Sequence, residues 1–410
     1  MTTAPVPRFA DPVPVPPVER RVSRRVAQLA GPAASGDATD AVGPVVDLAS
    51  GRPDVPTQPH VLAAAAAAVQ DPVYRQPAPP GGLAALQEAV VAAALRDSGL
   101  SARPADVLVT AGVTQAVAEA LATLLDDGDE VLLPAPHQAG LPDAVRLAGG
   151  VPVPVLADEA SGYLVSVGQL EAARTAHTRL LVFSSPSDPT GAVVPADEVA
   201  EIGRWAQAAG LWVLADESRA DLTYGPGAPS LPSLVPELQP HCVVVGGVGA
   251  LHGMAGWPVG WLLGPADVVA AATALQAHSG GPVSTVSQVA ACAALDGDRS
   301  GVAAARAAFD RRRRTALELL RTIPGIACPE PLGGHHLFPS VRALLGRPIA
   351  GRSVATSREL ARLLLTEARV AVVPGEEFGA PGYLRISYAV GDAELTEGLG
   401  RLQRLLATAG

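Results

Sequence analysis

From Val45 onward, short runs of β-branched and other apolar residues alternate with longer stretches in which apolar residues recur at helical spacing. Strands separated by helices are typical of right-handed βαβ units and of a mostly parallel sheet. The pattern predicts strands at 107–110, 130–134, 180–184 and 211–215, and helices at 114–124, 141–148 and 195–209. We therefore expect an α/β fold.

Composition divides the chain into three parts. Residues 1–44 carry prolines, an arginine-rich patch and a Gly/Ala/Ser linker, so they cannot bury enough apolar surface to fold alone and predict a flexible arm. Residues 45–279 hold the alternating pattern of a large α/β domain. Residues 280–410 predict a smaller α+β domain. Its expected helices are 301–320, 357–367 and 392–407, and its expected strands are 370–373 and 383–388.

The charge balance argues against nucleic acid and membrane partners. Asp and Glu number 40 against 30 basic residues, all of them arginine, which gives a formal net charge of −10. The three cysteines lie far apart without metal-ligand spacing, which predicts reduced thiols and no metal. The first residues show no basic start followed by an apolar run, and no stretch reaches membrane-spanning length. We expect a cytoplasmic protein that binds a small molecule.

Two motifs follow predicted strands. A glycine turn opens the helix after the strand at 107–110, and the free backbone N–H groups of such a turn suit an anion, although most such glycines only make the turn. The residues of this turn are Gly112, Val113 and Thr114. The second motif, at 211–217, places Asp216 at the end of a buried strand, where open α/β sheets bind ligands.

In order and spacing, these segments resemble the class I and II aminotransferases of fold-type I. The family pattern includes Thr-x-Gly-Ala-Thr-Gln (here 110–115), Asn-x-x-Asn-Pro-Thr-Gly (here 185–191), Asp-Glu-x-Tyr (here 216–219), a lysine-containing loop before Gly-x-Arg-x-Gly (here 247–260) and Leu-Arg-x-Ser (here 384–387). The match runs from Val45 to the C-terminus. The resemblance implies a large α/β domain, a smaller C-terminal domain, and a homodimer with its site between the lobes and at the subunit interface.

Several positions depart from the family. The sequence contains no lysine, and Ala250 matches the lysine that the family bonds to pyridoxal phosphate and uses for proton transfer. Pro258 and Gly249 match an arginine and a serine that bind the cofactor phosphate. The residues that match the family's contacts to the cofactor ring are Gln138, Asp188 and Arg219. We therefore expect no covalently bound cofactor, and these losses argue against noncovalent binding of pyridoxal or pyridoxamine phosphate.

Other positions keep the family pattern. Arg385 matches the arginine that binds the substrate α-carboxylate, and we assign it to substrate binding together with Tyr74 and Gly51. Tyr74 matches a residue that reaches the phosphate from the partner subunit. Asp216 matches the carboxylate that pairs with the pyridine nitrogen. The alternatives are a structural ion pair for Arg385, interface packing for Tyr74 and capping of backbone amides for Asp216.

Polar residues also stand where the cofactor would lie. We assign His252, Asp188 and Asp216 to proton transfer as catalytic candidates. Further candidates are His137, Gln138, Arg219, His335 and His336. No His-x-x-x-His spacing supports a metal site. The alternative is that the histidines are packed apart from one another.

The sequence thus predicts an aminotransferase-like protein that works independently of pyridoxal phosphate, as an enzyme or a binder of a small carboxylate or amino-acid-like molecule, in specialised metabolism. Whether it is an enzyme stays open at this point, but we expect that it is not a working pyridoxal-phosphate transaminase. One alternative is a non-catalytic pseudoenzyme or regulatory partner of an active paralogue. The other is an enzyme with noncovalent pyridoxamine phosphate. A homodimer is expected.

Overall fold

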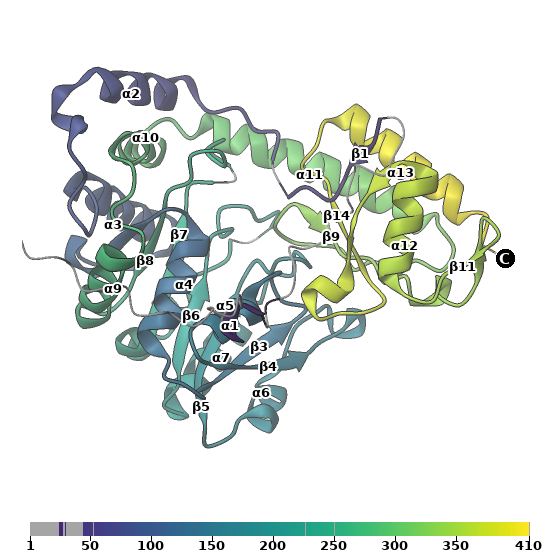
Figure 1. The fold of residues 1–410 in the computed structure, drawn as a ribbon, viewed down its shortest axis with the longest axis horizontal. Helices are drawn as coiled ribbons and strands as arrows, with labels where there is room; N and C mark the ends of the chain where they lie inside the picture. The colour runs from purple at the N-terminus through teal and green to yellow at the C-terminus, as the bar shows by residue number, and fades with distance from the viewer. Residues whose placement is uncertain are drawn as a thin grey trace, which may run out of the picture.

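The structure is a computed structural model and describes residues 24–27, 29, 44–51, 53–225, 227–249 and 251–409. A seven-stranded sheet forms its centre (Figure 1). The strands are β2 (Val107–Thr110), β3 (Glu130–Ala135), β4 (Val151–Leu156), β5 (Thr178–Ser184), β6 (Trp212–Asp216), β7 (Cys242–Gly247) and β8 (Gly260–Leu263), in the order β2-β8-β7-β6-β5-β3-β4. Only β8 runs antiparallel to its neighbours. The predicted fold class is confirmed.

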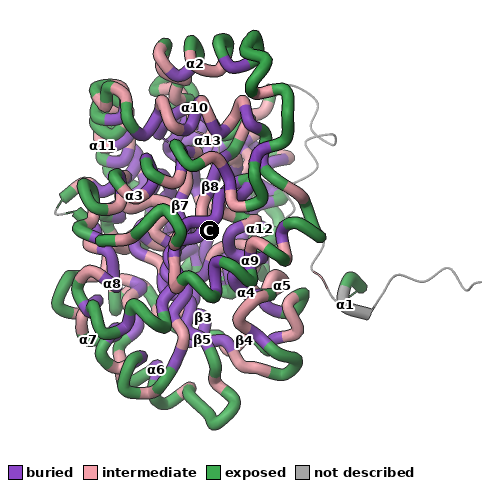
Figure 2. The backbone as a smooth tube through the Cα atoms, turned by 90° about the vertical axis from the view of Figure 1, so that its left-hand side faces the viewer, coloured by how far each residue is buried: buried purple, intermediate pink, exposed green. Residues whose placement is uncertain are grey.

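Helices cover both faces of this sheet because its strands are apolar on both sides. Along β5, Leu181 and Phe183 face one layer and Leu180 and Val182 face the other. The first layer contains α2 (Pro59–Gln70), α3 (Ala84–Ser98), α6 (Val167–Ala173), α7 (Ala196–Ala208), α8 (Leu231–Leu234) and α10 (Thr285–Asp296). The second contains α4 (Val113–Leu124), α5 (Leu141–Leu147) and α9 (Ala266–Ser279). Figure 2 shows the buried strands at the centre, with exposed backbone outside them.

A second hydrophobic core forms the smaller lobe, to the right of the sheet in Figure 1. Its helices are α11 (Ser300–Arg321), α12 (Ser357–Leu363) and α13 (Asp392–Leu406). Its strands are β1 (Val46–Asp47), β9 (His336–Leu337), β10 (Pro348–Ile349), β11 (Arg352–Ser353), β12 (Val370–Ala371), β13 (Val373–Pro374) and β14 (Leu384–Ser387). Because β1 pairs with β12, both ends of the described chain contribute to this lobe.

The elements predicted from the apolar pattern are present with small shifts at their ends. Two expectations differ more. The expected strand 370–373 is divided into β12 and β13, which belong to different sheets. The expected helix 357–367 ends as an α-helix at Leu363, and a π-helical turn, η7 (Leu364–Ala368), continues it. The domain boundaries stay a prediction. Helix α10 belongs by sequence to the expected smaller domain, but it packs against α2 and α3 of the large lobe. Almost all of the predicted arm lies outside the described residues. The part of the arm that is described contains the short helix α1 (Arg24–Ala27). No helix in the described ranges is long and apolar enough to cross a membrane.

Candidate functional site

The candidate site lies where the central sheet meets the smaller lobe. The loop after β5 carries Asp188, and β6 ends at Asp216. Ligands of open α/β sheets bind at this carboxyl edge. From the smaller lobe, β9 contributes His336 and β14 contributes Arg385. His336 pairs with Ser387, two residues from Arg385, so both side chains project from the same face.

Asp188 is the centre of a buried cluster of charged and polar side chains. Its side chain is 5% exposed, and its Oδ2 accepts a hydrogen bond from Arg219 Nη2 at 2.8 Å. Its Oδ1 accepts from Arg385 Nη1 at 3.4 Å and lies 3.3 Å from His336 Nδ1. Burial opposes ionisation of Asp188, but the charge of Arg219, with His336 and Arg385, holds the pKa of this carboxyl well below its usual range. One carboxylate therefore joins the two lobes.

Arg385 has contacts on both sides of the cluster. Besides Asp188, its Nη2 donates to the carbonyl oxygen of Ala49 at 3.1 Å, and its guanidinium lies 4.9 Å from the ring centroid of Phe378. Its Nε is buried without a hydrogen-bond partner among the described residues. Arg385 thus forms an ion pair with Asp188 across the two lobes, and its Nε–H remains available as a hydrogen-bond donor.

The two adjacent histidines are neutral and have defined tautomers. The ionised Asp188 only accepts hydrogen bonds, so His336 Nδ1 carries the hydrogen and its Nε2 holds a lone pair. His335 Nε2 lies 3.1 Å from the carbonyl oxygen of Gly51, so its Nδ1 holds the lone pair. Neither lone pair has a partner within the described part of the chain. Burial, with the charge of Arg385, lowers the pKa of His336 to about 4, and burial beside His336 holds the pKa of His335 well below its usual range.

This cluster predicts loss of stability in mild acid. The pKa of His336 is about 4 in the folded state, against an ordinary value of 6.5, so below pH 6.5 the unfolded chain binds more protons than the folded one. The free energy of unfolding therefore falls as pH falls. Between pH 7 and pH 5 the wild type should lose about 2 kcal/mol more than His336→Gln, measured by urea unfolding.

The control for this experiment is His177→Gln, because His177 is exposed. That variant should lose as much stability between the two pH values as the wild type does. Equal losses in all three proteins would show that His336 is not held neutral by its surroundings.

The predicted anion turn is present at the start of α4. Gly112 precedes the helix with φ of 87°, a left-handed conformation that favours glycine, and Val113 and Thr114 form the first turn. Thr110 Oγ1 donates to the carbonyl oxygen of Gly112 at 3.0 Å. A Cβ on Gly112 would lie 3.1 Å from Cβ of Pro258, so the position that matches the family's phosphate-binding arginine does lie at this turn.

A cavity of about 50 Å³ lies beside Asp216 and is also lined by Asp188, His137 and Gln138. Asp216 is buried, and its Oδ1 accepts from the backbone N–H of Ser218 at 3.0 Å. Burial lowers the pKa of His137, whose Nδ1 lies 3.2 Å from the carbonyl oxygen of Gln138. The structure thus brings these four candidates together at the sheet edge.

Three other candidates lie elsewhere or cannot be placed. His252 lines a different and larger cavity that has no lining residue in common with the one at Asp216. Tyr74 is half-buried on η2 (Pro72–Arg75), which packs against α10, and no interaction within the described ranges joins it to Asp188. Ala250 lies outside the described residues.

Sequence reasoning missed the ion pair between Asp188 and Arg219. Each was assigned singly, as a lost contact to the cofactor ring. The available signal was that the two departures carry opposite charges in neighbouring motifs, which is typical of a compensating pair. The contacts of Arg385 with Ala49 and Phe378 carry no comparable signal, because neither residue belongs to a motif.

The model of the family "Aminotransferase class I and II" matches residues 43–402. The chain belongs to this family. An aspartate aminotransferase of Streptomyces avermitilis is 52% identical over 96% of this chain and 98% of its own length. The crystal structure of the Rhizobium meliloti aspartate aminotransferase is similar with a TM-score of 0.91, 29% identity, and coverage of 95% of this chain and 100% of that one. The Thermus thermophilus aspartate aminotransferase with maleate has a TM-score of 0.87, 31% identity, and coverage of 94% and 100%.

These comparisons correct our functional predictions. We expected a protein independent of pyridoxal phosphate, possessing no transaminase activity, with a pseudoenzyme, a regulatory partner or a pyridoxamine-phosphate enzyme as alternatives. The 52% identity over 96% of the chain with a named aspartate aminotransferase overturns those expectations and the expected absence of the cofactor. The similarity of the whole chain outweighs the few substituted positions on which those predictions were based. The absence of lysine remains a property of the sequence.

Proposed function

We propose that this protein is an aminotransferase that moves an amino group between an amino acid and a keto acid with pyridoxal phosphate as its cofactor. The observation that carries the proposal is the 52% identity to an aspartate aminotransferase along 96% of the chain. L-Aspartate is therefore the amino donor to test first. We also retain the prediction of a cytoplasmic location.

The described residues fit two parts of the cofactor. The N-terminus of α4 at Gly112, Val113 and Thr114 offers backbone N–H groups to its phosphate. Asp216, buried at the end of β6, is placed to pair with its ring nitrogen. No lysine is present to bond its aldehyde, so hydrogen bonds and charge contacts hold the cofactor in this proposal. When bound, pyridoxal phosphate supplies the aldehyde that accepts the amino group and passes it on.

Arg385 is proposed to bind the substrate carboxylate. Its unused Nε and its position beside Asp188 leave a donor for an incoming carboxylate at the boundary of the lobes. The cluster contains the cations Arg219 and Arg385 against the single carboxylate of Asp188, so its excess positive charge favours one anionic group.

The test is an amino-transfer assay with L-aspartate, 2-oxoglutarate and added pyridoxal phosphate, in which both amino acids are measured by chromatography. Glutamate should form above the background rate of the free cofactor only when protein, cofactor, donor and 2-oxoglutarate are all present. Arg385→Lys should raise the KM for aspartate at least about tenfold, since an ammonium cannot reproduce the planar guanidinium fork.

Pyridoxal phosphate alone and heat-unfolded protein are the controls, because the free cofactor transfers amino groups slowly by itself. Binding is followed separately by quenching of tryptophan fluorescence. If the cofactor does not bind and a panel of amino donors gives only the background rate, the proposal is wrong.

We further infer that the protein forms a homodimer. Leu62 and Val69 on α2 and Val73 on η2 are large apolar side chains exposed to solvent, close in sequence to Tyr74. Leu62 and Val69 are seven residues apart on α2 and so lie on the same side of the helix, and exposed apolar side chains grouped in this way are typical of an interface. Light scattering should give twice the mass of the chain, and Val69→Asp should shift the protein toward the monomer. A monomeric wild type would contradict the inference.

A further inference from the structure

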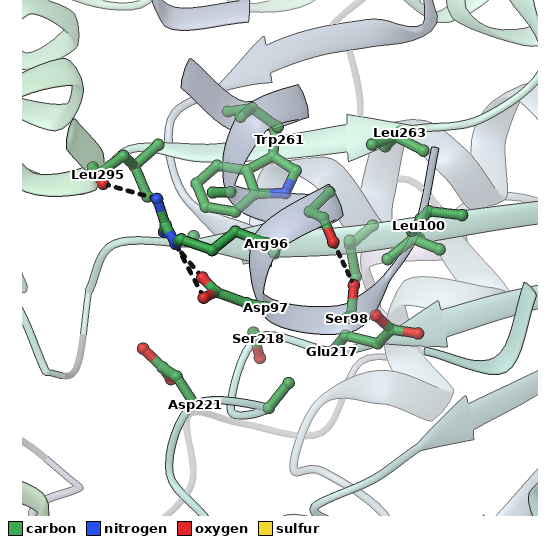
Figure 3. Close-up of a pocket in the computed structure, with 18 of the residues that line it drawn as sticks. Arg96, Asp97, Ser98, Leu100, Glu217, Ser218, Asp221, Trp261, Leu263 and Leu295 are labelled. Carbon is green, nitrogen blue, oxygen red and sulfur yellow. Dashed lines mark hydrogen bonds and ion pairs between the residues drawn. The ribbon is translucent and has the colours of Figure 1, made fainter. Parts of the chain in front are cut away.

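A second cavity beside the central sheet is separate from the candidate site. It has a volume of about 250 Å³, close to the lower end of ordinary ligand sites. It lies between the end of α3, the loop after β6, strands β7 and β8, and the start of α11, as the close-up in Figure 3 shows in part. None of its lining residues borders the cavity beside Asp216. The proposed aminotransferase site does not use it.

One wall of this cavity is apolar. Val90 and Ala93 on α3, Val244 on β7 and Trp261 on β8 contribute to it. The indole of Trp261 packs against the backbone at Gly246, where a Cβ would lie 2.7 Å from Trp261 Nε1. Glycine at 246 is therefore required for the indole to take this position. The wall suits an aliphatic side chain of a ligand.

A second wall carries excess positive charge. Arg96 donates to both carboxylate oxygens of Asp97, at 3.0 and 2.9 Å, and Arg299 donates to the same carboxylate. Two arginines thus share one aspartate. Arg306, on α11, makes no ion pair or hydrogen bond with any residue that the structure describes. This wall can bind a carboxylate.

The loop after β6 provides a negative wall. Asp221 lies below the pair of Arg96 and Asp97 in Figure 3, and it makes no ion pair or hydrogen bond with another described residue. Burial raises the pKa of Asp221 to about 6, so its carboxyl is ionised at pH 7.5. Glu217 lines the same side, but its Oε1 already accepts from Ser230 Oγ at 2.7 Å. The charges of Arg299 and Arg306 act on the carboxylate of Asp221, so these three groups lie near one another in the cavity.

We propose that this cavity is a second small-molecule site, which binds a zwitterionic amino acid with an aliphatic side chain. The ligand's carboxylate binds at Arg299 and Arg306, its ammonium group binds Asp221, and its side chain packs on the apolar wall with Trp261. A carboxylate beside two arginines favours a zwitterion over a simple anion or cation, because the ammonium and carboxylate groups of an amino acid are neighbours in the same way.

The site is connected to the proposed aminotransferase site through one short loop. Ser218 lines the cavity, and its backbone N–H donates to Asp216 Oδ1 at 3.0 Å. Ser218 therefore borders the cavity and also contacts the carboxylate at the end of β6. Binding in the cavity is positioned to influence Asp216.

The test uses three probes of similar shape and protein without added pyridoxal phosphate. L-Leucine carries both charges, 4-methylpentanoate lacks the ammonium group, and 3-methylbutylamine lacks the carboxylate. L-Leucine should change the tryptophan fluorescence saturably, and the change should be lost in Trp261→Phe. Calorimetry should show that each single-charge analogue binds at least about tenfold more weakly, since it leaves one charged wall unpaired.

Substitutions test which residues bind L-leucine. Asp221→Asn and Arg306→Gln should each weaken L-leucine binding at least about tenfold. Arg311→Gln, on the same helix but outside the cavity, and Arg385→Gln, in the Asp188 cluster, should leave it unchanged. No saturable binding by wild type overturns the proposal, as does equal binding by wild type and Asp221→Asn. Loss of binding in Arg385→Gln alone would assign leucine to the aminotransferase site and also overturn it.

Discussion

Ala250→Lys is expected to raise the rate of amino transfer at least about 100-fold, because a positioned general base contributes roughly 10²- to 10⁴-fold to a proton transfer. Our sequence comparison with the family pattern predicts that position 250 corresponds to the family's lysine, and the chain contains no ε-amine. The new side chain would supply both a nucleophile and a proton acceptor. The measurement is the single-turnover formation of keto acid from L-aspartate with saturating pyridoxal phosphate.

Ala250→Met is the matched control, since methionine is also an unbranched side chain but has no amine. It should be as slow as the wild type. The double variant Ala250→Lys, Pro258→Arg should bind the cofactor more tightly still, because position 258 lies at the turn of Gly112. If the lysine gives no gain over methionine, the cleft does not hold the cofactor in the manner proposed.

Asp188→Ala is expected to lower the free energy of unfolding by about 3–5 kcal/mol, the usual cost of removing one partner of a buried ion pair. The substitution would leave the guanidinium groups of Arg219 and Arg385 buried in a cluster without its anion. Each arginine is tied to a different lobe, so the contact between the lobes should loosen as well. Urea unfolding at pH 7.5 measures the first effect, and amide hydrogen exchange of β14 measures the second.

Two further variants sharpen this result. Asp188→Asn keeps the shape and an acceptor oxygen, so it should cost less than half as much as alanine. Glu397→Ala removes an exposed partner of Arg401 and should leave the stability nearly unchanged. If Asp188→Ala is as mild as Glu397→Ala, water already compensates the two arginines and the cluster does not join the lobes.

The layered fold was predictable because it depends on periodicity. Strand β6, which carries Val213 and Leu214, is apolar on both faces, and such a run between two helices is typical of a parallel sheet covered on both sides. The short strands of the smaller lobe were harder to predict. β1 is only two residues long, Val46–Asp47, and it exists because Val370 and Ala371 pair with it from the far end of the chain. No local pattern contains that information.

The candidate-site residues that belong to a sequence motif were predictable. Those whose side chains are directed by packing were less so. Asp216 was predicted from the end of a strand and Asp188 and Arg385 from the family motifs, and the structure places all three at the boundary of the lobes. His252 stands two residues from Ala250 in the sequence, yet it lines another cavity. The direction of a side chain in an irregular loop depends on neighbours from other elements, and spacing alone does not determine it.

The pairing of β1 with β12 has a consequence for the order in which the protein folds as it is synthesised. Every strand of the large sheet and its covering helices precede α11 in the chain, so the large lobe can assemble while the ribosome is still at work. Val46 leaves the ribosome early but obtains its hydrogen-bonded neighbours only after Val370 and Ala371 follow. Until then, the apolar residues Val46 and Leu48 have no neighbouring strand to pair with and can contact other nascent chains. A chaperone that shields exposed apolar segments would therefore act on this part of the chain.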